Sequence, residues 1–324
     1  MMNLLLLFSL FYYVNSFKCV SLRMSSDTPP PVWKTLSRAF KDSARNWFVN
    51  RAEAMGIDWK YLVENNKRSI LRIEELRKES TDYTMEYPSY FTQPFHGYED
   101  GNLNWDAALE CEPATLNMAA SYWKQINPIT TQDWLRYNVS KNIKSYITNS
   151  SLIKDPYMIL DVGCSIGISS EYLHKSFRNS EIEGVDLSPY FIAMAKFRAE
   201  KYDFPINYYH RNAEYTHMED KKYGLTVCSF VMHELPESAT INILEEMKRV
   251  LIPGGTIAIV DLTPKTLKSN FVTKFRKWAF EVTEPHIYGY YERDMKTLLT
   301  EAGFINVKEI KNDPMNSVWL ASKV

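Results

Sequence analysis

Short apolar runs alternate with stretches of helical apolar spacing over the second half of the chain. The runs lie at residues 159–161, 181–186, 206–210, 225–230 and 256–262. Each run has the length of a buried strand, and helix-like segments separate the runs, which predicts the strand–helix–strand units of a doubly wound sheet. We therefore expect an α/β domain over residues 151–324.

The first half of the chain has a mostly helical pattern. Leu36, Phe40, Ala44 and Phe48 recur at helical spacing with charged residues between them. The same kind of spacing predicts helices at residues 33–49, 59–76, 114–126 and 134–147. We expect residues 32–150 to form a helical cap or lid region that braces the α/β domain.

Residues 159–167 combine an apolar strand, an acid and two glycines. The strand ends at Asp161, the chain turns through Gly163 and Gly167, and a helical pattern begins at Ile168. Glycines let a ligand approach the backbone, and the start of the following helix presents free N–H groups. This arrangement predicts a nucleotide-cofactor turn.

Polar groups and a further glycine turn accompany the later strands at regular spacing. Asp186 ends the second run, where a carboxylate can accept both hydroxyls of a ribose. Asn212 follows the third run, and Phe230 leads into a His-Glu-Leu-Pro sequence after the fourth. A Pro-Gly-Gly turn at residues 253–255 precedes the fifth run.

Together these motifs resemble the class I S-adenosylmethionine-dependent methyltransferases over roughly residues 150–324, in particular the ubiquinone/menaquinone C-methyltransferase-like group. The Leu-x-Pro-Gly-Gly turn, the Phe-x-x-His-Glu-Leu-Pro loop and Glu-Ala-Gly-Phe at residues 301–304 are habitual in that family. The resemblance implies a Rossmann-like fold, with a mostly parallel, twisted sheet of about seven strands and helices on both faces. Ser165 stands where the family usually has its middle glycine, so the Gly-x-Gly-x-x-Gly fingerprint of a nicotinamide dehydrogenase is absent.

The resemblance implies S-adenosyl-L-methionine as the cofactor and assigns its contacts. Asp161 would hold the amino group of the methionine part, beside a loop formed by Gly163, Ser165 and Gly167. The other implied contacts are Asp186 at the ribose, Leu187, Asn212 and Ala213 at the adenine, and Phe230 beside the methionine and methyl region.

Three of these residues have plain structural alternatives. Asp186 could cap the helix that Ser188 and Pro189 begin. Asn212 could be an ordinary turn residue, and Phe230 could belong to the core.

The implied reaction is displacement of a methyl group from a sulfonium by a nucleophile held in line, so positioning, water exclusion and a nearby base supply the catalysis. His233 is the candidate base, because its ordinary pKa lies near 6.5. Glu234 would orient His233 or bind the acceptor. The alternative is that this loop is only the structural entry to a helix.

Two aromatic segments are candidates for the acceptor side of the site. Residues 87–105 have neither a helical nor a strand period, and in this fold class such a segment closes over the cofactor; its lid candidates are His96, Tyr98, Asn102 and Trp105. Residues 285–291 contribute His286 and Tyr288 as candidate acceptor contacts. The alternatives are an aromatic-packed connection between helices and a hydrophobic cover.

Two functions from different classes follow. In the favoured one, the protein transfers a methyl group from S-adenosylmethionine to a small molecule, either a quinone, phenol, carboxylate or sulfur metabolite. In the other, it binds S-adenosylmethionine as a regulatory or assembly protein without turnover. The sequence leaves open the acceptor atom and the oligomeric state.

Charge and cysteine content exclude several other classes. The chain has 38 basic and 39 acidic residues and a formal charge of −1, so it lacks the positive field that attracts nucleic acid. Cys19, Cys111, Cys164 and Cys228 have no paired spacing, so neither a zinc site nor a disulfide scaffold is indicated, and we expect no metal.

The first residues have the pattern of a targeting sequence. An apolar stretch at residues 3–14 is too short to span a bilayer comfortably, so we expect a signal peptide at residues 1–16 and no membrane span in the mature protein. Residues 17–31 are basic, bear serines and end in three prolines, which resembles the transit-like linker of proteins sent to the plastid of an alga with a secondary plastid. The alternative destination is the secretory pathway.

Overall fold

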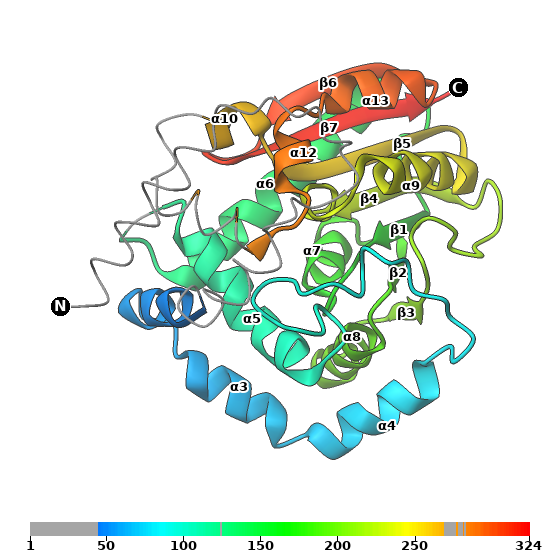
Figure 1. The fold of residues 1–324 in the computed structure, drawn as a ribbon. Coiled ribbons are helices and arrows are strands. Elements are labelled where there is room, and N and C mark those ends of the chain that lie inside the picture. The colour runs from blue at the N-terminus through cyan, green and yellow to red at the C-terminus, as the bar shows by residue number, and fades with distance from the viewer. Residues whose placement is uncertain (1–44, 124, 269–276, 278–280, 282) are drawn as a thin grey trace.

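The apolar runs form a seven-stranded sheet in the computed structural model, which describes residues 45–123, 125–268, 277, 281 and 283–324 (Figure 1). The strands are β1 (Met158–Val162), β2 (Glu181–Asp186), β3 (Ile206–His210), β4 (Tyr223–Ser229), β5 (Leu251–Leu262), β6 (Phe304–Lys311) and β7 (Asn316–Lys323). Their order is β3-β2-β1-β4-β5-β7-β6, with β7 antiparallel to both neighbours and the other pairs parallel. The predicted mostly parallel α/β sheet is confirmed.

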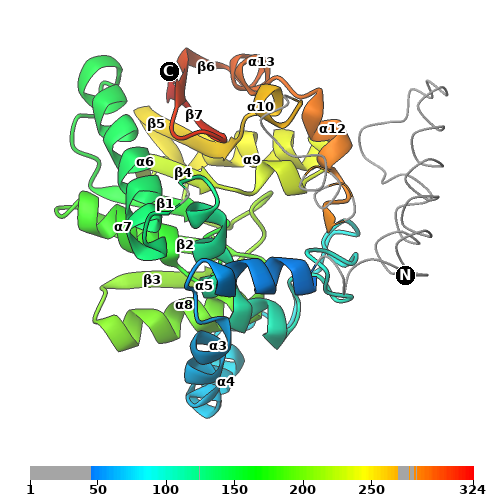
Figure 2. The same ribbon diagram turned by 90° about the vertical axis from the view of Figure 1, so that its left-hand side faces the viewer.

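Helices cover both faces of this sheet. The longer ones are α3 (Trp59–Lys67), α4 (Ile70–Ser80), α5 (Trp105–Ala120), α6 (Pro128–Ser150), α7 (Ile168–Ser176), α8 (Pro189–Tyr202) and α9 (Glu237–Val250). The shorter ones are α10 (Pro264–Lys268), α12 (Ile287–Tyr291), α13 (Met295–Glu301) and the 3₁₀ turn η2 (Met232–Glu234). Figure 2 shows the sheet between α6 and α7 on one side and α9 on the other.

Alternate residues of each strand supply the two cores, because successive side chains point to opposite faces. Ile159 of β1 belongs to the core that includes residues of α6, α7 and α8, whereas its neighbour Leu160 belongs to the core that includes residues of α9 and α13. Both side chains are fully buried. A parallel sheet covered on both faces needs such continuous apolar strands.

The helices before β1 join the domain through a third core. Trp59 and Val63 of α3 and Ile73 of α4 pack with the first turns of α5 and with α7 and α8. In Figure 1 α3 and α4 lie along the outer side of α5 and α8.

The predicted helices of this region differ from the observed ones at their ends. The expected helix at 59–76 is two helices, because the chain turns at Arg68 and Ser69 before α4 begins. The helix expected at 114–126 begins earlier, where the Asn104 side chain accepts a hydrogen bond from the Ala107 N–H and so caps α5. The helix expected at 134–147 is extended on both sides, beginning after the Asn127 cap.

Two neighbouring strands, β1 and β4, set the position of a ligand site. The chain leaves β1 toward β2 and β3 on one side and returns to β4 and β5 on the other. At such a reversal the loops at the carboxyl ends of the strands diverge and leave a crevice.

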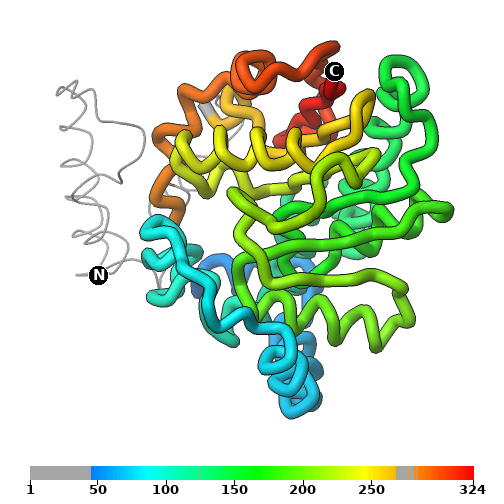
Figure 3. Tube along the Cα trace, turned by 90° about the vertical axis from the view of Figure 1, so that its right-hand side faces the viewer, coloured from blue at the N-terminus to red at the C-terminus, as the bar shows by residue number. Residues whose placement is uncertain are grey.

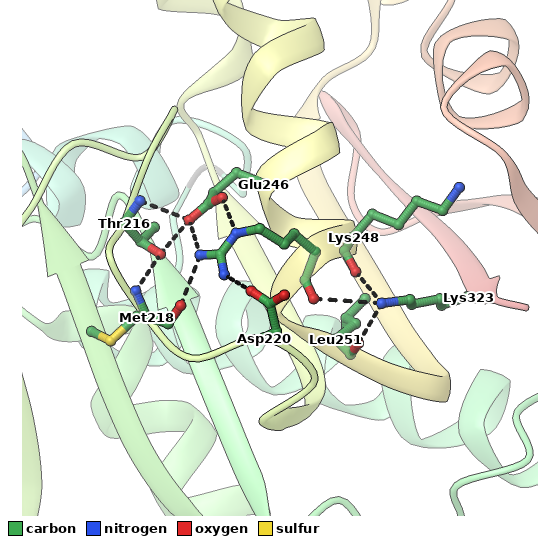
Figure 4. A network of polar contacts seen from close by, with 8 residues as sticks. Thr216, Met218, Asp220, Glu246, Lys248, Leu251 and Lys323 are labelled. Carbon is green, nitrogen blue, oxygen red and sulfur yellow. Dashed lines mark hydrogen bonds and ion pairs between the residues drawn. The ribbon is translucent and has the colours of Figure 1, made fainter.

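The opposite ends of the strands are held by a polar network (Figure 4). The guanidinium of Arg249, at the end of α9, donates to Glu246 and to the carbonyl of Met218, and Lys323 of β7 donates to the carbonyls of Lys248 and Leu251. These bonds fasten α9 to β7 and to the connection before β4.

The Pro-Gly-Gly turn belongs to this opposite end and does not line the cavity described below. A Cβ on Gly254 would lie 2.8 Å from the Leu152 side chain, and one on Gly255 would lie 3.0 Å from the Ile252 carbonyl oxygen. These glycines are therefore required by packing against the chain itself.

Residues 1–44 lie outside the described residues, and with them the expected signal peptide, the linker and most of the first expected helix. Residues 45–54 are helical and supply the end of that helix. None of the helices in the described ranges combines the length and apolar character needed to cross a bilayer.

Candidate active site

A cavity of about 430 Å³ lies at the carboxyl ends of β1, β2 and β4. Its volume falls within the range of about 300–1,000 Å³ that is usual for small-ligand pockets. Its floor comes from the loops after these strands, and its remaining wall comes from α5, α6 and the segments before them. Most of the candidate site residues line it: Gly163, Ser165, Asp186, Leu187, Asn212, Ala213, Phe230, His233, Glu234, His96, Tyr98 and Asn102.

The turn after β1 keeps its path although Ser165 replaces a glycine. Ser165 adopts a left-handed φ of 51°, a conformation in which a side chain is mildly strained. Its N–H donates to Asp186 Oδ2 at 2.9 Å, and its hydroxyl lies 3.3 Å from the Cys111 sulfur. These contacts hold the serine where the family's glycine usually turns.

The two glycines of this turn are required by the protein's own packing. A Cβ on Gly163 would lie 2.6 Å from the Val231 Cγ2 atom, and one on Gly167 would lie 2.8 Å from the Tyr208 ring. Gly163 faces the cavity, but Gly167 does not. The expectation that both glycines leave room for a ligand is therefore wrong for Gly167, whose missing side chain makes room for Tyr208.

Asp161 lies behind the cavity wall. It is fully buried, and its Oδ2 atom accepts hydrogen bonds of 2.6 Å from the hydroxyls of Ser169 and Ser170 in the first turn of α7. Burial raises the pKa of Asp161 despite these bonds and the positive charge of Arg136. In this arrangement Asp161 fastens β1 to α7 and does not line the cavity, whereas its hydrogen-bond partner Ser169 does.

Asp186, at the tip of β2, presents a carboxylate to the cavity. Backbone N–H groups of Ser165 and Ser188 donate to its two oxygens at 2.9 and 2.8 Å. Burial raises its pKa to about 6, although these backbone donors favour the ionised form. The helix cap is supplied by Ser188, whose hydroxyl accepts from the Phe191 N–H, so Asp186 is not needed as that cap.

The wall beyond Asp186 is apolar, with one polar turn. Leu187 and Ala213 line the cavity. The side-chain oxygen of Asn212 accepts from the Glu214 N–H at 2.9 Å, which is the turn contact proposed as its structural alternative.

Phe230 and Arg136 face each other at the tip of β4. Phe230 has a left-handed φ of 62°, which is rare for a bulky residue and is held by its N–H bond to the Val260 carbonyl at 2.7 Å. The Arg136 guanidinium, on α6, lies 5.1 Å from the centre of the Phe230 ring. Strain retained at a cavity wall is typical of functional sites.

His233 is held by a buried carboxylate that the sequence analysis did not single out. Its Nδ1 atom lies 2.7 Å from Asp261 Oδ1, at the end of β5, and its backbone N–H donates to Asp261 Oδ2 at 3.1 Å. Burial disfavours the imidazolium, but the Asp261 charge and hydrogen bond outweigh it and raise the pKa of His233 to about 9. Asp261 therefore orients the ring and leaves Nε2 for exchange of a proton on the cavity side.

Glu234 does not orient His233 through a hydrogen bond. Its Oε1 atom lies 4.0 Å from the Nε2 atom of His233 and 3.5 Å from that of His96. Burial raises the pKa of Glu234 to about 7, against the nearby charges of His96 and His233. The orienting role assigned to Glu234 thus falls to Asp261.

The aromatic loop (residues 87–104) reaches this cluster through His96. The Nε2 atom of His96 lies 3.2 Å from Glu284 Oε1, and its backbone N–H donates to the Thr283 carbonyl at 3.3 Å. Burial opposes protonation of His96, but Glu284 and Glu234 raise its pKa. Figure 3 shows the loop rising from α4 toward the segment that leads into α12.

The same loop is tied to α5 and to the helical residues 45–54. The Tyr98 hydroxyl donates to Glu110 at 2.5 Å, and Glu110 also pairs with Arg45. Asn102 lines the cavity, and its carbonyl accepts from the Ser188 hydroxyl at 2.6 Å. The loop is therefore fastened at several points along the cavity wall.

Three candidate residues of the two aromatic segments also lie outside the cavity wall. Trp105 begins α5 and packs edge-on against Tyr190, with ring centres 4.9 Å apart. His286 is buried edge-on against Tyr90, and Tyr288 is 44 % exposed. None of these three lines the cavity, because α5 and α12 turn them toward other neighbours.

Four residues of the site were missed by the sequence analysis: three that line the cavity, and Asp261, which holds His233. Asp261 ends an apolar strand, as Asp161 and Asp186 do, and the same rule identifies it. The other three, Arg136, Glu110 and Glu284, lie on helices or connections. There the spacing of apolar residues does not tell a charge that faces the cavity from one that faces solvent. Among the described residues no histidine, cysteine and carboxylate group has the arrangement of a metal site.

Comparisons with known proteins agree with this architecture. Residues 159–255 match the family model described as "Methyltransferase domain". The Ubiquinone biosynthesis O-methyltransferase of Coxiella burnetii is 28% identical over 126 residues, which cover 39% of this chain and 50% of the relative. The N-demethylindolmycin N-methyltransferase of Streptomyces griseus is 23% identical over 175 residues, covering 53% of this chain and 68% of the relative.

A solved structure shows the same fold. Human N-acetylserotonin methyltransferase in complex with SAM superposes with a TM-score of 0.52 at 15% identity, over 82% of this chain and 69% of that one. The chain spans about half the length of the first curated relatives that it matches.

Residues 159–255 thus match a methyltransferase domain, and the fold is shared with a methyltransferase solved in complex with S-adenosylmethionine, the cofactor that the sequence motifs also indicate. The cavity fits this cofactor, because a carboxylate at the tip of β2, apolar walls and a buried arginine with a spare donor converge on it. Asp186 would hold the ribose, Leu187 and Ala213 would pack against the adenine, and Phe230 would lie beside the methionine part. When bound, the cofactor supplies an electrophilic methyl group on a sulfonium.

Proposed function

We propose that this protein transfers a methyl group from S-adenosylmethionine to a hydroxyl group of a small, partly apolar acceptor such as a phenol or a reduced quinone. The observation that carries this proposal is the His233–Asp261 pair: Asp261 holds the Nδ1 atom, and His233 lines the cavity with its Nε2 atom 4.0 Å from Glu234. A neutral hydroxyl must lose its proton to become a good nucleophile, whereas a thioether does not.

The properties of His233 match a phenolic proton. A phenol has an ordinary pKa of about 10, and the pKa of His233 is raised to about 9. Proton transfer from the hydroxyl to Nε2 of the neutral ring is therefore nearly balanced; because the neutral ring is the minor form at pH 7, the rate should rise as the pH approaches 9. A carboxylate acceptor is less favoured, because Glu234, Asp261 and Glu284 surround His233 and would repel it.

The cavity wall suits an aromatic acceptor. Tyr90, Phe91 and Phe95 of the aromatic loop line it together with Trp47 and Phe48. Aromatic rings favour flat apolar ligands, and a loop fastened over the cavity excludes water from the developing nucleophile. We therefore assign the aromatic loop the role of a lid over the acceptor.

The curated relatives support a small acceptor. One acts in ubiquinone biosynthesis as an O-methyltransferase and another is named for N-demethylindolmycin, both small molecules by name. These names describe the relatives alone. We infer the acceptor of this chain from its own cavity.

The test is incubation of the full chain with methyl-labelled S-adenosylmethionine and a panel of phenols, hydroquinones, amines and thiols. We expect label in phenols or hydroquinones, and a loss of roughly 10²–10⁴ in kcat for His233→Ala. The matched control is His217→Gln, which changes an exposed histidine away from the cavity and should keep the rate. Labelling only of amines or thiols, or an unchanged rate for His233→Ala, would reject the hydroxyl assignment.

We also propose that residues 1–31 direct the protein to a secondary plastid. The support is the apolar stretch followed by a basic, serine-bearing and acid-poor stretch. A fluorescent protein that carries residues 1–31 at its N-terminus should enter the plastid of an alga with a secondary plastid. Release of the fluorescent protein to the medium would show secretion and reject the proposal.

A further inference from the structure

Glu284 is a buried carboxylate of the cavity wall with one oxygen left without a hydrogen bond. The residue is 3 % exposed and lines the cavity. Its Oε1 atom lies 3.2 Å from the Nε2 atom of His96 and accepts from the Thr283 hydroxyl at 3.4 Å. Its Oε2 atom has no hydrogen-bond partner within the described part of the chain. A buried carboxylate oxygen without a donor is unfavourable until a ligand or a water supplies one.

The other carboxylates of the site do not share this need. Both oxygens of Glu110 accept from an arginine guanidinium, and each oxygen of Asp186 and of Asp261 accepts from a backbone N–H group. The Glu234 side chain is 20 % exposed, so water reaches it. Of the carboxylates that line the described cavity, Glu284 alone has a buried oxygen without a donor.

Neighbouring side chains of the wall connect Glu284 to His233. Oε1 of Glu234 lies 4.0 Å from Nε2 of His233 and 3.5 Å from Nε2 of His96, which in turn contacts Glu284. The backbone that carries Glu284 is also held, because its carbonyl accepts from the Ile287 N–H at 3.3 Å. One small molecule in the cavity can therefore meet both His233 and Glu284.

The charges of this group favour a neutral donor over an ammonium. Burial raises the pKa of Glu284, but the charge and the hydrogen bond of His96 outweigh burial and lower it, so the carboxyl group is ionised. His96 balances this charge, and Asp261 is balanced by His233. Burial raises the pKa of Glu234 to about 7, so this group is partly protonated at neutral pH. A neutral hydroxyl therefore completes the site without adding an unbalanced charge.

We propose that Glu284 binds a second hydroxyl group of the acceptor, so that the acceptor is an aromatic diol and receives only one methyl group. The proposal rests on the proposed function for the hydroxyl at His233 and adds the group that the acceptor carries beside it. One hydroxyl oxygen bonds to the methyl carbon and its proton passes to Nε2 of His233, while the methyl–sulfur bond breaks and leaves its electron pair on sulfur. The other hydroxyl donates to Glu284 and keeps its proton.

The same contact limits the reaction to one methylation. A monomethylated diol that returns with its remaining hydroxyl at His233 presents a methoxy group to Glu284. A methoxy oxygen has no hydrogen to donate, so the buried Oε2 atom would stay unpaired. A site built to bind a substrate hydroxyl discriminates strongly against an analogue that lacks it.

The first test measures binding of acceptors to the unmodified full chain saturated with S-adenosylhomocysteine, which allows no turnover. The probes are tert-butylphenol and the tert-butyl derivatives of catechol and hydroquinone, which match it in apolar size. We expect the better of the two diols to bind about 10–100-fold more tightly than the phenol, because it adds a hydrogen bond to a buried charge. Equal affinities of the phenol and both diols would overturn the proposal.

The second test compares variants in the same binding measurement. Glu284→Met should reduce the preference for the diol over the phenol to less than about 3-fold, because it removes the acceptor of the second hydroxyl. Glu110→Gln is the matched control and should leave the preference unchanged, since both oxygens of Glu110 are bonded inside the protein. An unchanged preference in Glu284→Met would refute the proposal. Equal weakening of diol and phenol would show a structural role and refute it as well.

The third test follows products formed from methyl-labelled S-adenosylmethionine and the better diol. We expect the monomethyl ether to accumulate, because its own methylation should be about 10–100-fold slower in kcat/KM than that of the diol. Glu284→Gln should reduce this difference to less than about 3-fold: His96 holds the amide oxygen, and the NH₂ group then donates to a methoxy oxygen. Dimethylation by the unmodified chain as fast as monomethylation would overturn the proposal.

The outcomes separate this proposal from the proposed function. A diol preference that depends on Glu284, in a protein that transfers no methyl group, would support the second-hydroxyl site and reject hydroxyl methylation. Methylation of phenol and diols with equal kcat/KM and equal affinity would support the proposed function and reject the second-hydroxyl site. If Glu284→Met does not fold, the products of Glu284→Gln and the diol preference of the unmodified chain still decide.

Discussion

Replacing Asp261 with asparagine tests the chemistry of the site at its most informative point. Asp261 Oδ1 lies 2.7 Å from His233 Nδ1 and also accepts from the Leu262 N–H at 2.6 Å, while Oδ2 accepts from the His233 N–H at 3.1 Å. When Nδ1 carries a proton, all three contacts are N–H groups that donate, so both side-chain oxygens of residue 261 must accept hydrogen bonds. An amide offers an acceptor at only one of them.

The expected magnitudes follow from these contacts. Asp261 is the main source of the rise in the pKa of His233 from 6.5 to about 9, a difference of about 3 kcal/mol between the two protonation states. At a pKa of about 9, which His233 has beside the Asp261 carboxylate, about 1% of the His233 rings are neutral at pH 7. At the ordinary pKa of 6.5, about three quarters of them would be neutral. The amide also leaves an N–H group unpaired or selects the wrong tautomer, which costs roughly 1–3 kcal/mol of stability and about 10²–10⁴ in kcat.

The assay is NMR titration of the imidazole resonances, which requires no acceptor. The chain has six histidines, and the signal of His233 is the one that disappears in His233→Gln. We expect this signal to titrate near pH 9 in the unmodified protein and closer to pH 6.5–7 in Asp261→Asn. A midpoint that stays near 9 in Asp261→Asn would refute the assignment of Asp261 as the group that charges and orients His233.

Three further predictions concern the cofactor half, the fold and the lid. Affinity for S-adenosylhomocysteine should fall below about pH 6, because Asp186, the ribose acceptor, has a pKa raised to about 6 and becomes protonated there. Asp186→Asn should bind S-adenosylhomocysteine weakly at every pH. An affinity of the unmodified protein that does not change with pH would contradict this prediction. Gly167→Ala should lower the free energy of unfolding by about 1–3 kcal/mol more than the control Gly56→Ala. Both glycines have a positive φ, but only a Cβ at residue 167 would lie against Tyr208. Equal losses of stability would contradict the packing argument. His96→Ala should speed proteolytic cleavage within residues 87–104 by removing the contacts to Glu284 and Glu234, and unchanged cleavage would show that the other anchors of the loop suffice.

The sheet was predictable because most of its parallel strands are short apolar runs followed by polar or glycine-containing loops. Ile159 and Leu160 show the reason: β1 is buried on both faces, so its successive residues all carry the apolar signal. Strands β6 and β7 were not assigned individually. β6 lies at the sheet edge, and only Phe304 of its residues is buried, so it lacks a continuous apolar signal.

The site was predictable where it follows strand tips and not where it depends on helix faces. Asp186 and His233 sit in loops whose position the strands fix. Arg136 lies on a long helix, where only the tertiary structure decides which charge turns inward. Trp105 shows the converse error, since an aromatic residue at the end of a loop proved to be the first residue of α5.

The central claim is that this cavity joins S-adenosylmethionine to a small hydroxyl acceptor beside His233. The most direct measurement follows transfer of label from methyl-labelled S-adenosylmethionine into a low-molecular-weight metabolite extract, with the unmodified chain and His233→Ala side by side. The account predicts one discrete O-methylated product with the unmodified chain and its near absence with the variant. Binding of S-adenosylmethionine without any labelled product would contradict it and identify a cofactor-binding protein without turnover.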